Sequence, residues 1–338
     1  MSSDPNELWL LGIDGGGSKT LAWLARLENA TDECTIEDEH VLGKGLSGPS
    51  NPQVVGFQNA INSVEEAVAL AWESTGAPPR PVAVMAAALA GCGRAEDQSR
   101  FRFLVTRARL SEETIVVGDA EAALAAGAPD RVGVAVIAGT GSMVWGRNDD
   151  GKTVRSGGWG YLFGDEGSGY WLAIEALRSI ARAADGRALS TTLTVTLLTA
   201  LGLREPQELI GAIYGANRPR EEIASLAQIV LNEASNGDRQ AFALLERGAS
   251  ELALAVRAVV QQLDFPKRFG REASYPDYRL ICAGGLLANF EGYRHRLEVH
   301  LRQLAIPPTE IVTAKNPAMG ALRLALDHSR ELPPPSDT

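Results

Sequence analysis

Residues 8–20 read LWLLGIDGGGSKT, and this stretch decides the fold. The apolar run from Leu8 to Ile13 predicts a short buried strand, and Asp14 with the three glycines predicts a tight turn after it. Strand-like sequence resumes in residues 20–28. The pattern therefore favours a β-hairpin over a strand that leads into a helix.

The same order of elements returns in residues 133–146, GVAVIAGTGSMVWG, where an apolar strand, a glycine turn and a second strand follow one another. This repetition predicts two related domains. Between the two hairpins, strand patterns in residues 81–90 and 114–119 alternate with helical spacing in residues 53–74 and 95–109. Such alternation favours an α/β fold with much parallel sheet.

The second half of the sequence is mostly helical, with one further strand and Gly-Gly turn in residues 279–285. We assign residues 1–129 to an N-terminal domain and residues 130–328 to a C-terminal domain whose last helix can pack back on the N-terminal one. The tail, residues 329–338, is expected to be disordered. Helices are predicted to start after Gly169, near Arg187, Pro219 and Gly237, and at Pro317.

Composition limits the classes of partner. The chain has 338 residues and a formal net charge of −10, which weighs against nucleic acid or an anionic membrane surface because both need clustered Lys and Arg. No apolar run reaches transmembrane length, and no signal peptide is visible. The cysteines Cys34, Cys92 and Cys282 are far apart and odd in number, which favours a reducing cytoplasm over a disulfide framework.

The first glycine turn is a candidate phosphate site. Its glycines let backbone N–H groups approach an anion, and its polar side chains add donors. Asp14 is a candidate to hold Mg²⁺ through water. A Walker A loop needs glycine directly before the lysine, whereas Ser18 intervenes here, and the remaining alternative is a hairpin that binds no ligand. The turn consists of Gly15, Gly16, Gly17, Ser18, Lys19 and Thr20.

The second glycine turn, which contains Thr140, Gly141 and Ser142, also follows an apolar strand. One such turn is weak evidence, because turns are rich in Gly, Ser and Thr. Two turns at matching places in two domains are stronger evidence. We predict that they face each other across an interdomain cleft and hold one triphosphate.

Asp119 lies at the end of a predicted strand and the start of a predicted helix, between the two glycine turns in sequence. A carboxylate there can accept the proton of a substrate hydroxyl during phosphoryl transfer. The alternative is a structural role as a helix N-cap, which Asp fills well.

Residues 157–170, GGWGYLFGDEGSGY, are too glycine-rich for a regular element and too aromatic for an ordinary surface loop. We interpret them as a sugar pocket, in which an aromatic wall pairs with a carboxylate that accepts hydrogen bonds from sugar hydroxyls. The alternative is that Asp165 and Glu166 cap the helix that follows. Later in the chain, Gly284 and Gly285 allow close approach of a flat adenine ring, although ordinary strand-to-helix turns look the same.

Seven motifs occur in one order across nearly the whole chain, and together they resemble the N-acetylglucosamine kinase family in the BadF/BadG/BcrA/BcrD-type ATPase group. The segment GGWG…GDEGS is the most specific of them. The resemblance implies a two-domain, ribonuclease H-like fold related to actin, Hsp70 and hexokinase, with ATP and sugar in the interdomain cleft. The motifs are IDGGGSKT, GPSNPQ, ALAGCGR, GDAEAAL, IAGTGS, GGWGYLFGDEGSGYW and CAGGL.

The resemblance also implies roles for individual residues. Asp119 is similar to the catalytic base of these kinases, and ATP and Mg²⁺ are the expected cofactors. The remaining positions fall into three groups: sugar contacts at Asn51, Gly158, Trp159, Gly160 and Asp165; phosphate contacts at Gly15 to Thr20 and Thr140 to Ser142; and adenosine contacts at Gly284 and Gly285.

The function implied is ATP-dependent phosphorylation of an amino sugar, with N-acetylglucosamine 6-phosphate as the expected product. Glucosamine and N-acetylmuramic acid remain alternative substrates, and a homodimer is expected by analogy. Two rival functions stay open. One is an ATPase that activates a radical dehydratase or reductase, although the three cysteines do not match its [4Fe–4S] pattern. The other is a sugar sensor without catalysis, although no DNA-binding segment is visible.

Overall fold

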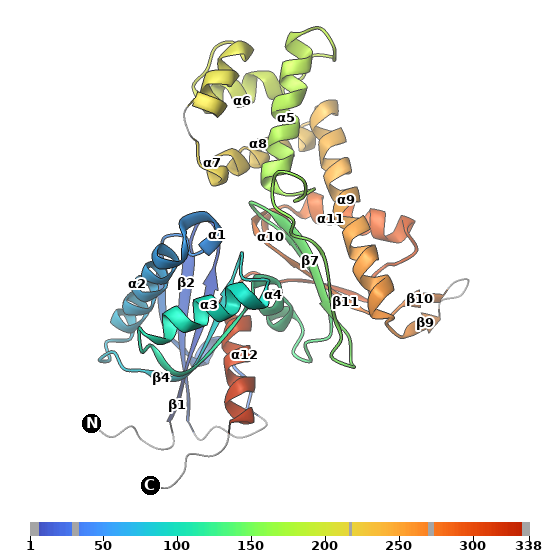
Figure 1. The fold of residues 1–338 in the computed structure, drawn as a ribbon. Coiled ribbons are helices and arrows are strands. Elements are labelled where there is room, and N and C mark those ends of the chain that lie inside the picture. Colours follow the sequence, from blue (N-terminus) through green and yellow to red (C-terminus); the bar gives the residue numbers. More distant parts are fainter. Residues whose placement is uncertain (1–6, 29–33, 216–217, 270–273, 333–338) are drawn as a thin grey trace, which may run out of the picture. The chain divides into compact units, whose positions relative to one another are not determined.

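The protein is described here by a computed structural model that covers residues 7–28, 34–215, 218–269 and 274–332. The chain divides into two compact units (Figure 1). Unit 1 comprises residues 1–131 and 316–338, and unit 2 comprises residues 132–315. The last helix of the chain therefore belongs to unit 1.

Unit 1 is built on a five-stranded sheet with the order β3-β2-β1-β4-β5. Its first two strands form the antiparallel hairpin that the glycine turn predicts, whereas β1, β4 and β5 run parallel. The strands are β1 (Glu7–Gly15), β2 (Thr20–Glu28), β3 (Val41–Ser47), β4 (Val82–Leu89) and β5 (Ser111–Gly118). The helices are α1 (Pro52–Val55), α2 (Phe57–Thr75), α3 (Ala95–Thr106), α4 (Asp119–Gly127) and α12 (Pro317–Glu331).

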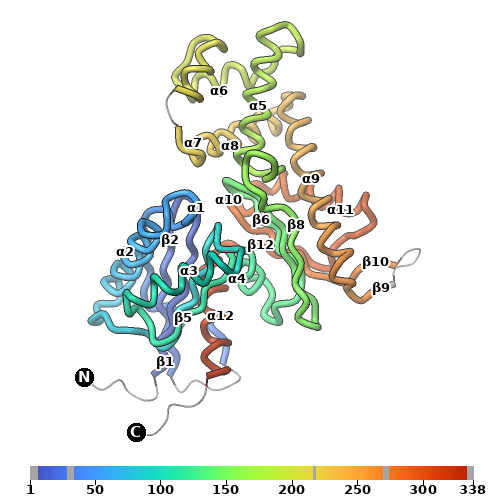
Figure 2. The backbone as a smooth tube through the Cα atoms, viewed as in Figure 1, coloured from blue at the N-terminus to red at the C-terminus, as the bar shows by residue number. Residues whose placement is uncertain are grey.

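Helices cover both faces of this sheet. Successive residues of β1 point to opposite faces, and the apolar side chains on each face are buried against helices. Leu11 and Ile13 are fully buried in a core shared with α2 and α3. Leu10 is buried on the other face, in a core shared with α4 and α12. Figure 2 shows α12, in red, beside the blue β1, although the two come from opposite ends of the sequence.

The C-terminal helix corrects one prediction. The tail was expected to be disordered from residue 329, whereas α12 continues to Glu331. Its inner face stays in the core of unit 1 as far as Leu326, and Ser329 Oγ donates a hydrogen bond to the carbonyl oxygen of that residue at 2.7 Å. The prolines that stop a helix begin only at residue 333. Residues 333–338 lie outside the described part of the chain.

Unit 2 repeats the plan of unit 1. Its main sheet has the order β12-β11-β6-β7-β8, in which an antiparallel hairpin again lies next to parallel strands. The repeated strand, turn and strand pattern in the sequence is thus matched by two sheets of the same topology. These strands are β6 (Gly133–Ala138), β7 (Ser142–Arg147), β8 (Thr153–Gly157), β11 (Arg279–Ala283) and β12 (Glu310–Thr313); β9 (Lys267–Phe269) and β10 (Ser274–Pro276) form a separate pair.

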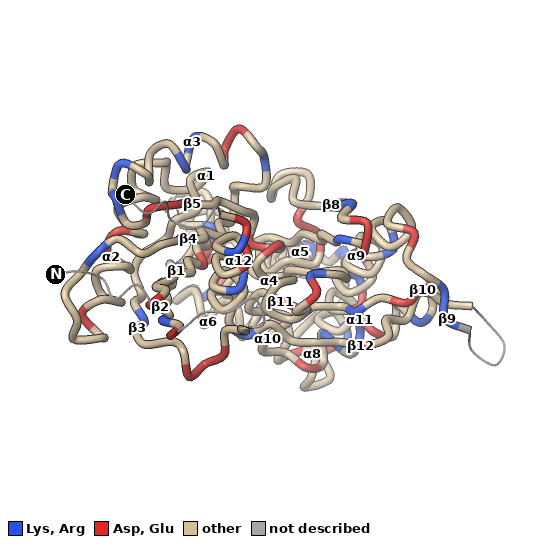
Figure 3. Tube along the Cα trace, turned by 90° about the horizontal axis from the view of Figure 1, so that it is seen from below, with Lys and Arg blue, Asp and Glu red and all other residues tan. Residues whose placement is uncertain are grey.

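Charged residues of both signs are interspersed along the chain. Figure 3 shows Lys and Arg alternating with Asp and Glu in both units, so the net negative charge is not gathered on one element. Among the described helices, none combines the length and the apolar character that crossing a bilayer requires.

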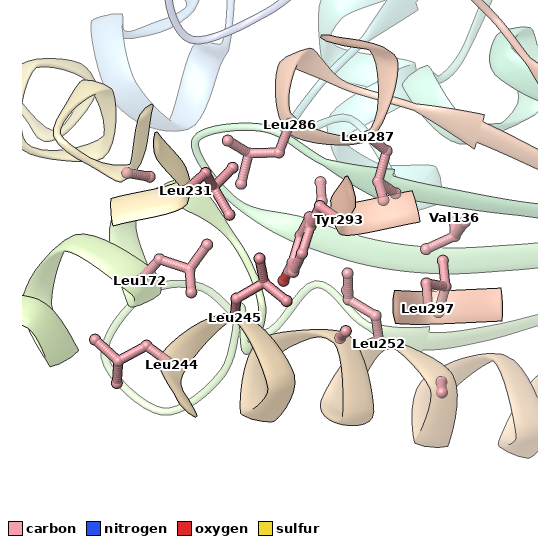
Figure 4. Packing of buried hydrophobic residues seen from close by; sticks show 14 of the residues in the cluster. Val136, Leu172, Leu231, Leu244, Leu245, Leu252, Leu286, Leu287, Tyr293 and Leu297 are labelled. Carbon is pink, nitrogen blue, oxygen red and sulfur yellow. The ribbon is translucent and has the colours of Figure 1, made fainter. Parts of the chain in front are cut away.

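The helices of unit 2 enclose an apolar core. Figure 4 shows Tyr293 within it, near Leu245 and Leu252. The Tyr293 hydroxyl is buried but satisfied, because it donates to the carbonyl oxygen of Gly167 at 2.8 Å. This bond ties the GDEGS segment to the core. The helices are α5 (Gly169–Ala184), α6 (Leu193–Leu201), α7 (Arg220–Ser225), α8 (Ala227–Ser235), α9 (Arg239–Leu263), α10 (Gly285–Asn289) and α11 (Glu291–Gln303).

The close approach of α12 to α4 leads to a stability prediction. A Cβ atom at Gly320 would overlap the carbonyl oxygen of Ala122, so Gly320→Ala should lower the free energy of unfolding by about 1–3 kcal/mol. Thermal or urea unfolding measures the change. The matched control is Gly292→Ala in α11, where a Cβ atom meets nothing within 4 Å and the variant should be as stable as wild type or slightly more so. Equal stabilities of the two variants would contradict the close packing of α4 and α12.

Candidate active site

Three loops of unit 1 start at the same edge of its sheet. In the parallel register, Gly15 of β1 lies opposite Leu89 of β4, which lies opposite Gly118 of β5. The backbone N–H of Ala90 then donates to the carbonyl oxygen of Gly15 at 2.8 Å. Asp119, the residue after β5, is therefore brought to the edge where Asp14 and the first glycine turn lie.

The two aspartates at this edge influence each other. The pKa of Asp14 is raised to about 7, chiefly by burial and also by the negative charge of Asp119, whereas Lys19 opposes the shift. Burial also raises the pKa of Asp119, although that carboxylate accepts hydrogen bonds from backbone N–H groups. A carboxylate with a raised pKa is a better proton acceptor than an ordinary one.

Asp119 does not serve as an N-cap. The cap position of α4 is Gly118, and Asp119 is the first residue of the helix. Its Oδ1 atom accepts a hydrogen bond from the backbone N–H of Ala120 at 3.0 Å, which fixes the side chain locally. The structural alternative considered from the sequence is therefore not realised.

The space available for a side chain differs among the glycines of the first turn. A Cβ atom at Gly15 would overlap the Ser50 hydroxyl and the Leu89 side chain, so packing within unit 1 demands glycine there. A Cβ atom at Gly16 would meet only the Lys19 carbonyl oxygen, at an ordinary 3.7 Å. Gly16 closes the turn by donating its N–H to that oxygen at 2.9 Å. The open space at Gly16 is what approach of an anion to the backbone would need.

Thr20 has a structural role in the first turn. It is fully buried, and its hydroxyl lies 2.6 Å from the carbonyl oxygen of Gly48 and 2.8 Å from the Ser50 hydroxyl. Ser18 and Lys19, in contrast, are exposed. Of the three polar side chains in the turn, these two are free to reach a phosphate, while Thr20 holds the turn in place.

Asn51 is tied to the first turn. The backbone N–H groups of Ser50 and Asn51 both donate to the carbonyl oxygen of Gly16, at 3.0 and 3.1 Å. The Asn51 Oδ1 atom caps α1 by accepting from Gln53 N–H at 3.0 Å. Gly91 must be glycine, because a Cβ atom there would overlap that same oxygen. The NH₂ group of Asn51 is left as the donor that a ligand can use.

In unit 2, Asp165 links the second glycine turn to the aromatic loop. A Cβ atom at Gly141 would meet Asp165 Oδ2 at 2.8 Å, so the carboxylate lies directly against the turn. It accepts hydrogen bonds from the backbone N–H groups of Ser142 and Gly160. Its side chain is only 7% exposed, and burial raises its pKa despite those bonds and the nearby Arg220.

Asp165 also has an unusual backbone. Its φ of +57° lies in the left-handed region, which residues other than glycine rarely occupy. Such a conformation persists only where the surroundings hold it, and it is common at functional sites. The helix that follows is capped by Ser168, whose Oγ accepts from Trp171 N–H at 3.2 Å. Asp165 and Glu166 therefore do not cap it.

Trp159 projects from the aromatic loop, with 59% of its surface exposed. Gly158 and Gly160 on either side of it have φ values of +69° and +89°, which explains why glycine flanks the ring. The Arg155 guanidinium lies 5.7 Å from the ring centroid. An exposed indole between two glycines of left-handed backbone conformation is suited to stacking on a ligand.

The second glycine turn lies beside the Gly-Gly turn that follows β11. Ile137 of β6 pairs in parallel register with Ala283 of β11. A Cβ atom at Gly284 would meet the carbonyl oxygen of Ala138 at 2.5 Å, and a Cβ atom at Gly139 would lie 3.8 Å from Gly285 N. The candidate phosphate and adenosine segments of unit 2 are thus neighbours, like the three loops of unit 1.

Comparison with known sequences identifies the family. Residues 11–325 match the sequence profile of the BadF/BadG/BcrA/BcrD ATPase family. The chain belongs to this ATPase family. The resemblance inferred from the motifs is thereby confirmed.

Two proteins similar to this chain are named as sugar kinases. The chain is 33% identical over 318 residues to the N-acetylmuramic acid/N-acetylglucosamine kinase of Clostridium acetobutylicum, covering 94% of this chain and 98% of the relative. It is 30% identical over 333 residues to the N-acetyl-D-glucosamine kinase of Dictyostelium discoideum, covering 95% and 98% of the two chains.

Solved structures extend the comparison to the fold. A protein of Chromobacterium violaceum provisionally named N-acetylglucosamine kinase is 25% identical, with a TM-score of 0.74 over 94% of this chain and 99% of that one. The hexokinase of Schistosoma mansoni, at 12% identity, has a TM-score of 0.58 over 97% of this chain and 87% of that one. The predicted α/β fold of the sugar-kinase type is confirmed.

The sequence patterns do not point to one residue that lies near the candidate site, Arg220. Arg220 starts α7, and its Nη2 atom lies 3.9 Å from Asp165 Oδ2. A single arginine after Pro219 carries no motif, and more than fifty residues separate it from Asp165. Only the packing of α7 reveals it.

The raised pKa of Asp14 predicts how stability depends on pH. Folding raises this pKa from 3.8 to about 7, so ionising Asp14 costs free energy of folding that is absent below about pH 4 and reaches its full size near pH 7. Without nucleotide, Asp14→Asn should therefore be more stable than wild type above about pH 7, by at most about 4 kcal/mol. The advantage should shrink toward pH 4.

Thermal unfolding across this pH range checks the prediction. The matched control is Asp149→Asn, at an exposed position in the turn between β7 and β8, which should give no such trend. An advantage of Asp14→Asn that is equally large near pH 4 and near pH 8 would contradict the raised pKa.

Proposed function

We propose that this protein is an ATP-dependent kinase that phosphorylates an amino sugar, with the 6-hydroxyl group of N-acetylglucosamine as the favoured acceptor. The observation that carries the proposal is the position of Asp119, a carboxylate of raised pKa at the sheet edge that also bears Asp14 and the first glycine turn. The two relatives named as N-acetylglucosamine kinases, matched over nearly their full length, support the class of substrate.

The proposed sugar contacts are Asn51, Trp159 and Asp165, with Gly158 and Gly160 shaping the backbone beside the indole. The exposed ring of Trp159 is suited to stack on a sugar face, and the NH₂ group of Asn51 to donate to a hydroxyl or an acetamido oxygen. Asp165 holds the loop through Ser142 and Gly160, and we propose that it also accepts a hydrogen bond from the sugar.

The proposed ATP contacts are the two glycine turns, Gly15 to Lys19 and Thr140 to Ser142, and the Gly-Gly turn at Gly284 and Gly285. Backbone N–H groups and Lys19 bind the phosphates in this proposal. Thr20 and Ser142 contribute chiefly by holding the turns, because their hydroxyls already bond to Gly48 and Glu166 within the protein.

The residues present fit Mg²⁺. Asp14 and Asp119 are two carboxylates of raised pKa at one edge, and their mutual repulsion is what a divalent cation would relieve. Oxygen donors and retained water suit this ion. Asp14 is the residue that would hold it, and the bound ion would neutralise charge on the phosphate oxygens.

The reaction that we propose relies on Asp119 as the base. Its carboxylate accepts the proton of the sugar 6-hydroxyl group while that oxygen forms a bond to the γ-phosphorus of ATP. The bond from the γ-phosphorus to the bridging oxygen breaks, and ADP leaves. Phosphoryl transfer of this kind depends mainly on positioning and charge stabilisation, which Trp159, Asn51 and the glycine turns supply.

Two of the three cysteines do not support the rival function as an activating ATPase. Cys92 and Cys282 are buried, and burial raises the pKa of each thiol to about 12. Such thiols stay protonated and are poor metal ligands. The two also belong to different units. A homodimer and a cytoplasmic location stay predictions.

Asp119→Asn tests the base. We expect kcat to fall roughly 10²- to 10⁴-fold, because Asn cannot accept the proton, while the affinity for ATP changes little. A coupled assay of ADP release measures kcat, and a direct binding assay measures ATP affinity. Asp149→Asn serves again as the control. If kcat stays within a few-fold of wild type, Asp119 is not the base.

Trp159→Ala tests the sugar contact. Loss of the stacked indole should raise KM for N-acetylglucosamine roughly ten-fold or more and leave KM for ATP nearly unchanged. Phe242→Ala, which removes another partly exposed aromatic ring of unit 2, is the control. Equal increases in both KM values would indicate general loosening of the loop instead.

A further inference from the structure

Arg220 lies among residues of the candidate sugar pocket. Its Nη2 atom is 3.9 Å from Asp165 Oδ2, and its guanidinium carbon is 4.5 Å from the centroid of the Tyr161 ring. Tyr161 in turn packs edge-on against Tyr170, with ring centroids 5.1 Å apart. The position of α7 is fixed by its packing on the start of α5, where a Cβ atom at Gly169 would meet the carbonyl oxygen of Ala224 at 3.0 Å.

Part of the hydrogen-bonding capacity of Arg220 is unused among the residues that the structure describes. Its Nε atom is buried and has no partner among the described residues. The distance of 3.9 Å to Asp165 is too long for a hydrogen bond, and that carboxylate already accepts from Ser142 and Gly160. About 30% of the Arg220 side chain remains exposed, so part of the guanidinium can be reached from solvent.

A guanidinium in this state is prepared to bind an oxyanion. Its fork of donors matches the two oxygens of a carboxylate or phosphate. The ring of Tyr161 supports its planar group, which lowers the entropy lost on binding. A buried Nε without a partner would gain a hydrogen bond when such a ligand arrives.

We infer that Arg220 is a specificity-determining residue that binds the carboxylate of an acidic amino sugar, of which N-acetylmuramic acid is the simplest example. This inference rests on the proposed kinase function. The other source of an oxyanion is a phosphate of ATP. The surroundings favour the sugar, because Tyr161, Tyr170 and Asp165 all belong to the segment assigned to the sugar pocket. N-Acetylglucosamine has no carboxylate, so the contact to Arg220 raises the affinity for N-acetylmuramic acid only.

The experiment compares N-acetylmuramic acid, N-acetylglucosamine and ATP as varied substrates for wild type and for Arg220→Gln. We expect KM for the acidic sugar to rise roughly 10- to 100-fold, as for loss of a charge-assisted pair. KM for the neutral sugar and for ATP should stay within about three-fold. Arg220→Lys, which keeps the charge but not the fork, should recover part of the loss.

Arg218→Gln is the matched control. Arg218 lies two positions before Arg220, but its guanidinium pairs with Glu222, so its removal should not change the preference between the two sugars. Unfolding temperatures of all variants establish that they are folded. If Arg220→Gln is not folded, the comparison of Arg220→Lys with wild type carries the test, since only a fork-dependent site loses the acidic sugar selectively.

Several outcomes would overturn the inference. Equal increases in KM for both sugars would make Arg220 a support for Asp165 and Tyr161 alone. A selective increase in KM for ATP would assign the oxyanion to the nucleotide. A wild-type enzyme that phosphorylates N-acetylglucosamine but not N-acetylmuramic acid would refute acidic-sugar recognition and leave the proposed kinase function intact. Failure to phosphorylate any amino sugar would refute both.

Discussion

The parallel pairing of β4 with β1 on one side and β5 on the other is the constraint on which the candidate site of unit 1 depends. Because Gly15, Leu89 and Gly118 are aligned in register, the loops that follow the three strands leave the sheet at one level. Ligand sites of α/β proteins form at such carboxyl edges. A slip of one residue in the β1–β4 pairing would turn Asp14 to the opposite face of the sheet, and a slip in the β4–β5 pairing would shift Asp119 relative to Asp14.

Unit 2 uses the same strand order but a different means of holding its loops. There, the buried carboxylate of Asp165 accepts backbone hydrogen bonds from Ser142 and Gly160, so that one side chain fixes both the glycine turn and the aromatic loop. Burial of a carboxylate is costly unless its oxygens are hydrogen-bonded. The left-handed backbone of Asp165 is a second cost. Both costs are consistent with a loop whose shape matters more than its stability.

The glycines of the candidate site have distinct physical roles. Gly15, Gly91 and Gly141 are required by neighbouring side chains of the protein, because a Cβ atom would collide with Ser50, Asn51 or Asp165. Gly158 and Gly160 are required by their backbone angles. At Gly16, neither a neighbouring side chain nor the backbone angle requires glycine. A glycine motif therefore mixes positions that shape the fold with positions that leave room for a ligand.

The sequence by itself determined the two hairpins, the alternation of strands and helices, and the position of Asp119 at a strand end. Those features depend on local patterns of apolar residues and glycine, which neighbouring residues specify. The family followed from seven short motifs kept in one order. The sequence pattern places the end of α12 too early, because burial of its inner face in the core of unit 1 outweighs the polar character of its last turn.

Only the tertiary structure decided what each candidate side chain touches. Thr20 looks like a phosphate contact in sequence, but it is buried and bonded to Gly48. Arg220 carries no sequence signal, yet the packing of α7 on α5 brings it to Asp165. These outcomes depend on contacts between residues far apart in the chain, and local propensity holds no information about such contacts.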